Sequence, residues 1–187
     1  RRIKYLRTTD STNDAIFDFL ENQELQSGNV LIAEEQMAGK GRRGNQWISS
    51  PFKSLTFSFL IENNDPLLNK KLPLACGISI VKAIKQIGRI DCSLKWPNDI
   101  LYNSKKIAGI LIEQKKNHFI VGIGVNVNDS QFHDTLSERA SSLQLILNHA
   151  TQREPLLAFI FNHFEKLLSN DIQDIIIEWE SFCNHIN

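Results

Sequence analysis

The segment 118–128 alternates strictly between two kinds of residue, and this alternation restricts the fold more than any other feature of the chain. The odd-numbered positions are apolar: Phe119, Val121, Ile123, Val125 and Val127. The even-numbered positions from 122 onward carry Gly122, Gly124, Asn126 and Asn128. Because successive side chains of a β-strand point to opposite faces, this pattern predicts a strand with one face in a core. The glycine face predicts either a flat platform for a planar ligand or a surface against which a helix packs closely.

Other patterns predict a mixed α and β chain, with helices near both ends and strands between them. Apolar residues at Leu55, Phe57, Phe59 and Ile61 alternate with small polar ones, which predicts a strand with one buried face. Further strands are expected over 3–6, 30–33, 93–96, 100–102 and 107–113. The polar segment 114–118 should join the last of these to the alternating strand as a hairpin.

Helices are expected where apolar residues recur at three- and four-residue spacing. The first follows residues 10–13, Asp-Ser-Thr-Asn, whose side chains are typical helix caps. A second covers about 67–87, where Pro73 indicates either a late start or a kink. Two more are expected over 156–167 and around 172–179.

Length and charge exclude several classes of protein. With 187 residues and 42% hydrophobic content, the chain is expected to form one domain. Lys plus Arg and Asp plus Glu each total 21, so no global field favours a nucleic acid or a membrane as partner. The three cysteines lack CxxC spacing, which argues against disulfides and a thiolate zinc site and favours a reducing cytoplasm. The sequence also lacks HExxH and G-x-S-x-G, the signatures of zinc proteases and of serine hydrolases.

A glycine-rich cationic loop, Gly-Lys-Gly-Arg-Arg-Gly, occupies residues 39–44. It matches G-x-G-x-x-G, but a dinucleotide-binding fingerprint must open a helix, whereas here a strand pattern follows. No Walker loop occurs in the chain. The loop is instead suited to bring backbone N–H groups and guanidinium groups close to an anion, and to become ordered around a ligand. A solvated basic loop is the alternative interpretation.

A lysine stands near a strand end in the segment 95–99, Lys-Trp-Pro-Asn-Asp, because Pro97 ends the strand ladder. If Lys95 points into a site, its ammonium group can neutralise a carboxylate and a phosphate as they approach each other. The alternative is an exposed strand lysine. Gly109 adds a position without a side chain on the neighbouring strand, so its gap and the gap at 122–124 are expected to form one pocket floor.

Taken together, these segments resemble the motifs of biotin–protein ligases. In order, the motifs are Ser11-Thr12-Asn13, Gln36 with the loop 39–44 and Trp47, Lys95 to Asp99, Lys106 to Ile110, and Gly122 to Asn126. The resemblance covers roughly the first two thirds of the chain. The loop together with the Lys-Trp-Pro-Asn-Asp segment is highly specific, whereas the first or last motif alone would be weak.

The resemblance implies an α+β fold of the class II aminoacyl-tRNA synthetase and biotin ligase type, with a mixed, largely antiparallel sheet flanked by helices. It also implies a reaction in two steps. The carboxylate of biotin attacks the α-phosphate of ATP, which enters with Mg²⁺, and pyrophosphate leaves. A lysine on the biotin-acceptor domain of a biotin-dependent carboxylase then attacks the carbonyl of biotinyl-5′-AMP. Positioning and charge neutralisation should supply most of the catalysis.

Motif matching also implies roles for individual residues. The catalytic cations would be Lys95, against the biotin carboxylate and the phosphate, and Arg42, over the adenylate. The biotin-binding residues would be Ser11, Thr12, Asn13, Gln36, Lys40, Gly41, Arg42, Lys95 and Gly109. The nucleotide-binding residues would be Arg42, Trp47, Lys106 and Asn126. For Lys106, an exposed hairpin lysine is an equally good interpretation, and the site is expected to hold no metal through protein ligands alone.

The chain departs from the fuller family pattern in three respects. Lys40 replaces a commoner arginine, which keeps the charge but loses the bidentate fork. No DNA-binding helix-turn-helix precedes Ile3, and no small β domain follows the helix around Trp179, so residues 1–187 are expected to be a single catalytic domain. Two other functions stay open: a lipoate or octanoate ligase or transferase, and a non-catalytic biotin-binding module. An exposed hairpin edge is compatible with a homodimer.

Overall fold

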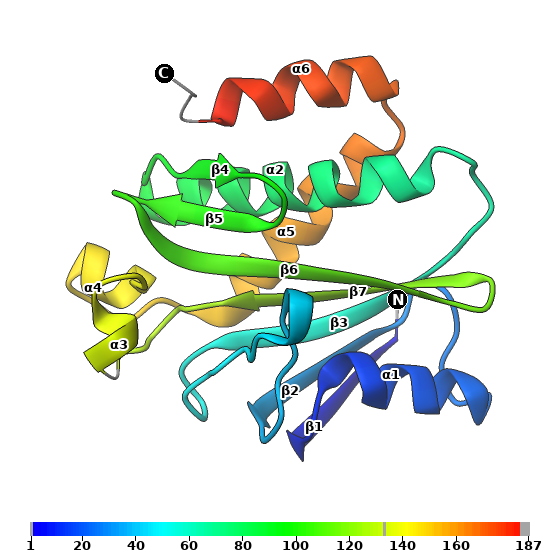
Figure 1. Cartoon of the computed structure of the whole chain (residues 1–187), viewed down its shortest axis with the longest axis horizontal. Helices are drawn as coiled ribbons and strands as arrows, with labels where there is room; N and C mark the ends of the chain where they lie inside the picture. Colours follow the sequence, from blue (N-terminus) through cyan, green and yellow to red (C-terminus); the bar gives the residue numbers. More distant parts are fainter. Residues whose placement is uncertain (1, 133, 184–187) are drawn as a thin grey trace.

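A seven-stranded sheet runs through the computed structural model, which describes residues 2–132 and 134–183 (Figure 1). The strands are β1 (Ile3–Thr9), β2 (Val30–Gln36), β3 (Leu55–Glu62), β4 (Ser93–Lys95), β5 (Asp99–Tyr102), β6 (Lys105–Lys115) and β7 (His118–Val125). The helices are α1 (Thr12–Glu21), the 3₁₀ turn η1 (Arg42–Gly44), α2 (Leu68–Gly88), α3 (Asp134–Ser137), α4 (Leu143–Leu147), α5 (Arg153–Leu168) and α6 (Ile172–Phe182).

The strands lie in the order β1-β2-β3-β7-β6-β5-β4. β1 and β2 are parallel, and all the other neighbours are antiparallel. The predicted hairpin is confirmed, since Lys115 pairs with His118 at the turn between β6 and β7. The expectation of a mixed, largely antiparallel sheet flanked by helices is therefore confirmed.

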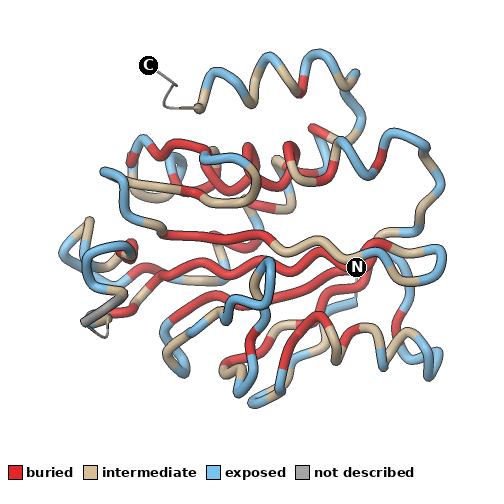
Figure 2. The backbone as a smooth tube through the Cα atoms, in the orientation of Figure 1, coloured by how far each residue is buried: buried red, intermediate tan, exposed pale blue. Residues whose placement is uncertain are grey.

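Helices cover both faces of this sheet. In Figure 1, α2 and α5 lie on one face with α6 outside them, and α1 lies on the other face beside β1 and β2. The larger core fills the α2 face, where the rings of Phe59 and Phe164 meet edge to face at a centroid distance of 5.2 Å. A smaller core joins Ile16 of α1 to Leu31, Leu60 and Ile120. Figure 2 shows the result, a central sheet that is buried along most of its length.

Burial on both faces corrects the prediction for β3. The alternation predicted one buried face, but Thr56 and Ser58 on the opposite face are also buried, at 4% and 0% exposed. The reason is that α1 and the cationic loop cover the face to which these side chains point. The prediction of a helix over about 67–87 is confirmed by α2, which begins at Leu68 and continues through Pro73, so of the two alternatives at Pro73 the late start is excluded.

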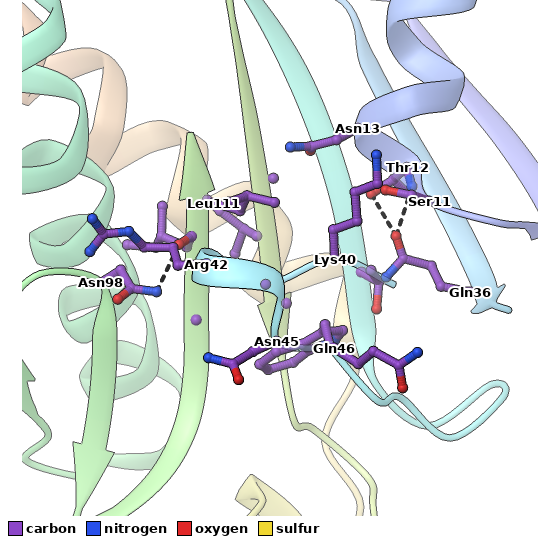
Figure 3. Close-up of a pocket in the computed structure, with 18 of the residues that line it drawn as sticks. Ser11, Thr12, Asn13, Gln36, Lys40, Arg42, Asn45, Gln46, Asn98 and Leu111 are labelled. Carbon is purple, nitrogen blue, oxygen red and sulfur yellow. Dashed lines mark hydrogen bonds between the residues drawn. The ribbon is translucent and has the colours of Figure 1, made fainter. Parts of the chain in front are cut away.

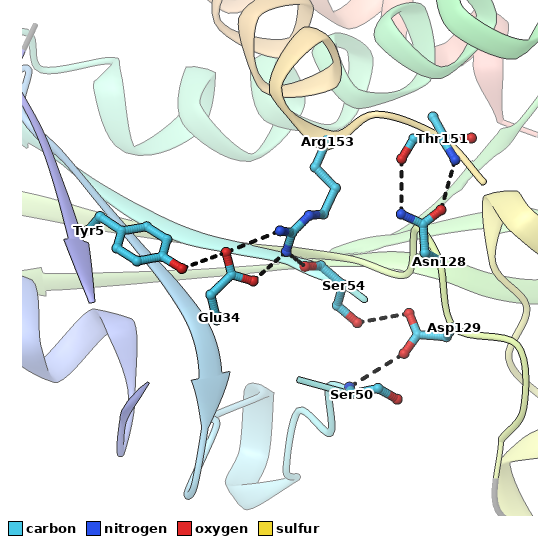
Figure 4. A network of polar contacts seen from close by, with 8 residues as sticks. All are labelled: Tyr5, Glu34, Ser50, Ser54, Asn128, Asp129, Thr151 and Arg153. Atoms are coloured by element: carbon cyan, nitrogen blue, oxygen red, sulfur yellow. Dashed lines mark hydrogen bonds and ion pairs between the residues drawn. The ribbon is translucent and has the colours of Figure 1, made fainter. Parts of the chain in front are cut away.

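An ion pair and its hydrogen bonds connect the start of α5 to β2 (Figure 4). Arg153 donates to both carboxylate oxygens of Glu34, at 2.6 and 3.1 Å, and also to the carbonyl oxygen of Ser54 at 3.0 Å. Tyr5 donates to the same carboxylate at 2.9 Å. Asp129 accepts a hydrogen bond from the Ser54 hydroxyl at 2.8 Å, so the segment after β7 is fixed to the start of β3.

Two short helices, α3 and α4, were not predicted. α4 is only five residues long, and its start is stabilised by Ser142, whose hydroxyl accepts a hydrogen bond from Leu145 N. Five residues give too few turns for a helical period to be recognised. Within residues 2–132 and 134–183, no helix is both long enough and apolar enough to cross a membrane.

Candidate active site

A cavity of about 150 Å³ lies on the α1 face of the sheet, beneath the loop that follows β2 (Figure 3). Most of the residues predicted for the site line it: Ser11, Thr12, Asn13, Gln36, Lys40, Gly41, Arg42, Trp47, Lys106 and Gly109. They come from α1, β2, the loop and β6. Figure 3 shows Arg42 and Asn98 on one side of the cavity, and Ser11, Thr12 and Gln36 on the other.

The floor of the cavity is a row of register partners across four strands. Thr56, Gly124, Gly109 and Asp99 lie opposite one another on β3, β7, β6 and β5. The two central positions have no side chain. The prediction that Gly109 and Gly124 form one floor is therefore confirmed.

In this structure the planar group on the floor is the indole of Trp47. A Cβ atom at Gly124 would lie 2.2 Å from Cε2 of Trp47, and one at Gly109 would lie 3.2 Å from its Cζ3. At Gly122 a Cβ atom would lie 2.3 Å from Oδ1 of Asn13, on α1. Close helix packing therefore explains Gly122, and the flat platform explains Gly109 and Gly124. Nε1 of Trp47 is buried and has no hydrogen-bond partner among the described residues, so it is available to an oxygen of a ligand.

Polar side chains form the α1 end of the cavity. Oε1 of Gln36 accepts hydrogen bonds from the backbone N of Thr12 at 2.7 Å and from its hydroxyl at 3.0 Å. The buried Ser58 hydroxyl lies 2.7 Å from both Thr12 Oγ1 and Asn13 Oδ1. Asn13 Nδ2 in turn donates to the Glu113 carboxylate at 2.7 Å. This end of the cavity therefore offers donors and acceptors held in fixed positions.

The start of α1 differs from the prediction in a way that affects this site. Ser11 occupies the cap position, but its side chain makes no capping hydrogen bond. A side chain from β2 supplies the acceptor instead, because Gln36 accepts from the free backbone N–H of Thr12. Ser11 is 2% exposed and lines the cavity. Its hydroxyl is therefore not committed to capping.

The cationic loop closes on itself above the floor. Gly41 N donates to Asn45 O at 2.8 Å, and Trp47 N donates to Gly39 O at 2.9 Å, so the two sides of the loop pair like a short hairpin. Lys40 forms an ion pair with Asp14 of α1 at 2.6 Å, and the hydrogen bond to Asp14 is the main reason that the pKa of Lys40 is raised. The loop thereby brings positive charge to the α1 side of the cavity.

Lys106 reaches the cavity because β6 contains a bulge. The register between β5 and β6 shifts at Ile100 and Leu101, which pair with Ala108 and Lys106. Regular alternation would place Lys106 and Gly109, three residues apart, on opposite faces, and a bulge reverses that relationship. Nζ of Lys106 lies 2.7 Å from Asp99 Oδ1 and 5.6 Å from the ring centroid of Trp47. Lys106 is thus the lysine that lines the floor.

Two predicted residues do not line this cavity. Lys95 is exposed and lines a separate hollow with Trp96 and Trp179. Lys95 is the register partner of Asp99, but it lies on the edge strand β4, one strand beyond the cavity. The expectation that Lys95 points into the site is therefore corrected. Asn126 is 4% exposed, and its amide donates to Ser141 O at 3.1 Å, so it fixes the chain after β7 instead of lining the cavity.

Sequence reasoning missed several residues of the site. Asp99 and Asn98 belong to the segment 95–99, in which only Lys95 was predicted to be a site residue. Ser58 and Glu113 belong to no recognised motif, and only their place opposite Asn13 in the fold relates them to the site. Among the described residues, no group of three or more His, Cys, Asp or Glu side chains is arranged to hold a metal ion.

Comparison with known proteins identifies the family. Residues 5–128 match the model of the biotin/lipoate A/B protein ligase family, which is more than half of the chain. The chain belongs to this family. The resemblance to biotin–protein ligases noted from the motifs is therefore confirmed.

Individual members of the biotin/lipoate ligase family agree with this result. The bifunctional ligase/repressor BirA of Bacillus subtilis is 31% identical over 176 residues, which cover 88% of this chain and 54% of BirA. The biotin–[acetyl-CoA-carboxylase] ligase of Mycobacterium tuberculosis is 28% identical, over 97% of this chain and 66% of that protein. Biotin protein ligase from Aquifex aeolicus in complex with biotin and ATP is 30% identical, with a TM-score of 0.88 over all of this chain and 80% of that one. The chain spans about half the length of the BirA proteins it matches.

Proposed function

We propose that this chain catalyses the ATP-dependent ligation of biotin to a lysine of an acceptor protein, through biotinyl-5′-AMP. The observation that carries the proposal is the division of one cavity into two chemical ends. A polar end at α1, with Thr12 and Gln36, suits a small ring that has both N–H and C=O groups. A cationic end, with Lys106 and Arg42, suits a carboxylate and a phosphate. The glycine floor joins the two ends.

In the first step, one carboxylate oxygen of biotin forms a bond to the α-phosphorus of ATP, and the bond to pyrophosphate breaks. Lys106 and Arg42 lower the repulsion between the two anions and stabilise the negative charge of the transition state. Asp99 holds the ammonium group of Lys106 over the floor, 2.7 Å from its carboxylate. The protein's part is mainly to orient the two substrates and to neutralise their charge.

In the second step, the amine of the acceptor lysine attacks the carbonyl carbon of biotinyl-5′-AMP, and AMP leaves. The amide forms without further ATP. Mg²⁺ is expected to enter with ATP and to bind its phosphate oxygens. In this scheme Lys106 takes the role that motif matching gave to Lys95, and Asn126 supports the fold near the site.

Comparison with similar proteins supports biotin over lipoate. The Aquifex aeolicus ligase, with a TM-score of 0.88, was solved with biotin and ATP. A lipoate head group is a dithiolane without N–H groups, and it would leave the polar end of the cavity unsatisfied. A non-catalytic biotin-binding module is the less favoured alternative, because it would not need the cations of the second end.

The partner we propose is the biotin-acceptor domain of a carboxylase. A cytoplasmic location and a homodimer stay predictions. The free cysteines Cys76, Cys92 and Cys183 favour a reducing compartment. A dimer could use β6, which extends past its pairing with β5 as far as Lys115.

The test is biotin-dependent exchange of labelled pyrophosphate into ATP, which reports the first step without an acceptor. We expect exchange with biotin and none with lipoate or octanoate. Exchange that depends on lipoate would favour the ligase of that substrate. Binding of biotin without any exchange would favour the non-catalytic module.

A further inference from the structure

The cationic loop joins the rest of the chain at its base, where Ala38 N donates to Asp10 O at 2.9 Å. Above this point its backbone hydrogen bonds lie within the loop itself. Among the described residues, the side chains of 40–46 make one ion pair to another element, and it joins Lys40 to Asp14 of α1. This pair is therefore the polar contact that can hold the tip of the loop against α1.

Lys40 contacts both oxygens of the Asp14 carboxylate. Its Nζ lies 2.7 Å from Oδ1 and 2.6 Å from Oδ2. Figure 3 shows the side chain of Lys40 extended toward α1, where Ser11 and Thr12 lie. A second cation, Nζ of Lys115 on β6, lies 3.6 Å from Oδ1 of the same carboxylate. Asp14 thus lies between a lysine of the loop and a lysine of the sheet.

We infer that Asp14 is a positioning residue that holds the loop over the cavity through Lys40. This inference rests on the proposed function and deepens it, because in that function the loop covers biotinyl-5′-AMP until the acceptor arrives. An ammonium group with both oxygens of a carboxylate within 2.7 Å is committed to that partner. Lys40 therefore acts on the ligand through the position of the loop, whereas Arg42 and Lys106 supply the charges that face the phosphate.

The exposure of the pair sets the size of its effect. The side chains of Lys40 and Asp14 are 46% and 35% exposed. Water screens a pair this exposed, so its contribution is modest. We expect loss of the pair to speed the release of biotinyl-5′-AMP about threefold, because the loop opens more often. A weak pair suits a loop that must open again for the acceptor lysine.

The sign of this effect separates the inference from a simple effect of charge. Biotinyl-5′-AMP is an anion, so loss of a nearby carboxylate should by itself strengthen its binding and slow its release. Asp14→Asn removes that carboxylate, yet the inference predicts faster release. Because Asp14 lies in the first turn of α1, where a carboxylate stabilises the helix, a second variant must break the pair without altering α1. Lys40→Gln is that variant.

The experiment measures the release of labelled biotinyl-5′-AMP, which is bound to the chain and then chased with an excess of the unlabelled compound. We expect Asp14→Asn and Lys40→Gln each to release it about threefold faster, and the double variant no faster than either one. Asp14→Glu keeps the carboxylate and should release it at nearly the unaltered rate. Raising the salt concentration from about 0.05 M to about 0.5 M should reduce the difference between Asp14→Asn and the unaltered chain, since salt screens an exposed pair.

Two variants serve as controls. Glu21→Gln removes a carboxylate from the other end of α1, where it pairs with Lys116. Lys115→Met removes the second cation beside Asp14 and leaves the pair with Lys40 in place. Both should release biotinyl-5′-AMP at the unaltered rate.

Release that is slower or unchanged in Asp14→Asn would overturn the inference while the proposed function stood. Additive effects of Asp14→Asn and Lys40→Gln would also overturn it, because they would mean that Lys40 contacts the ligand directly. Failure of the unaltered chain to bind biotinyl-5′-AMP is a different outcome, and it would overturn the proposed function and this inference together.

Discussion

Nζ of Lys106 lies 2.7 Å from Oδ1 of Asp99, and this ion pair joins two residues of different motifs on adjacent strands. The pair exists because the bulge in β6 brings Lys106 to the same face as Gly109. Each side chain is about one third exposed, so the pair itself contributes little to stability. Its importance is that it holds a cation over the floor of the cavity.

Lys106→Ala should therefore reduce biotin-dependent pyrophosphate exchange by about 10²-fold to 10³-fold, the usual effect of removing one donor to a developing anion. Lys95→Ala is the matched control, since it removes a lysine from the same face of the sheet two strands further out, on β4. It should keep near wild-type exchange. If Lys95→Ala lost exchange and Lys106→Ala kept it, the catalytic role would belong to Lys95.

Gly124→Ala should displace Trp47, because the new methyl group would lie 2.2 Å from Cε2 of the indole. We expect a loss of about 1–3 kcal/mol in the free energy of unfolding, as for other overpacked sites. The same substitution in a Trp47→Ala background should cost much less, since the collision is gone. Equal losses in both backgrounds, measured by urea denaturation, would show that the indole does not lie on the floor.

The loop 39–47 should be cut more slowly by trypsin when biotin and ATP are bound. Its basic residues Lys40, Arg42 and Arg43 are the cleavage sites, and two of them line the cavity. The C-terminal side of Lys116, at the hairpin turn, is an internal reference. Equal protection at both places, or none at the loop, would contradict a loop that closes over its ligands.

Arg153→Met should destabilise the protein by about 3 kcal/mol at neutral pH, because it leaves the 7%-exposed carboxylate of Glu34 without its cation. Thermal or chemical denaturation of both proteins would measure the difference. A loss below about 0.5 kcal/mol would show that the pair is not formed.

The same pair predicts how this difference depends on pH. Burial alone would raise the pKa of Glu34, but hydrogen bonds from Arg153 and Tyr5 outweigh it and hold the pKa below its ordinary value of 4.5. In the unaltered protein this contribution to stability is present above pH 4.5 and is lost as the pH falls through the lowered pKa. In Arg153→Met, burial should raise the pKa of Glu34. The difference in the free energy of unfolding between the two proteins should therefore become smaller as the pH falls. A difference in the free energy of unfolding that grows in acid would contradict the ion pair between Glu34 and Arg153.

The sequence was sufficient for the fold class and for most of the cavity. Periodicity alone located β3, β6, β7 and α5 to within a few residues, because their apolar spacing reflects which face is buried. The residues of the polar end and the loop came from matching motifs. These motifs are local, so they need no knowledge of which strands become neighbours.

What the sequence did not reveal depends on pairing between distant segments. The bulge that turns Lys106 toward Gly109 is a property of the β5–β6 register, and strand alternation misassigns that side chain. The capping of α1 by Gln36 joins residues 24 positions apart. Lys95 was placed at a strand end, as observed, but only the strand order shows that its strand is an edge.

The central claim is tested most directly by the mass of an acceptor. The chain would be incubated with ATP, equal concentrations of biotin and lipoate, and a biotin-acceptor domain, and the acceptor would be weighed by mass spectrometry. We expect a gain of one biotinyl group, and loss of that gain in Lys106→Ala. A gain of a lipoyl group would contradict the claim that this chain joins biotin to protein. So would an acceptor that stays unmodified although the chain has formed biotinyl-5′-AMP.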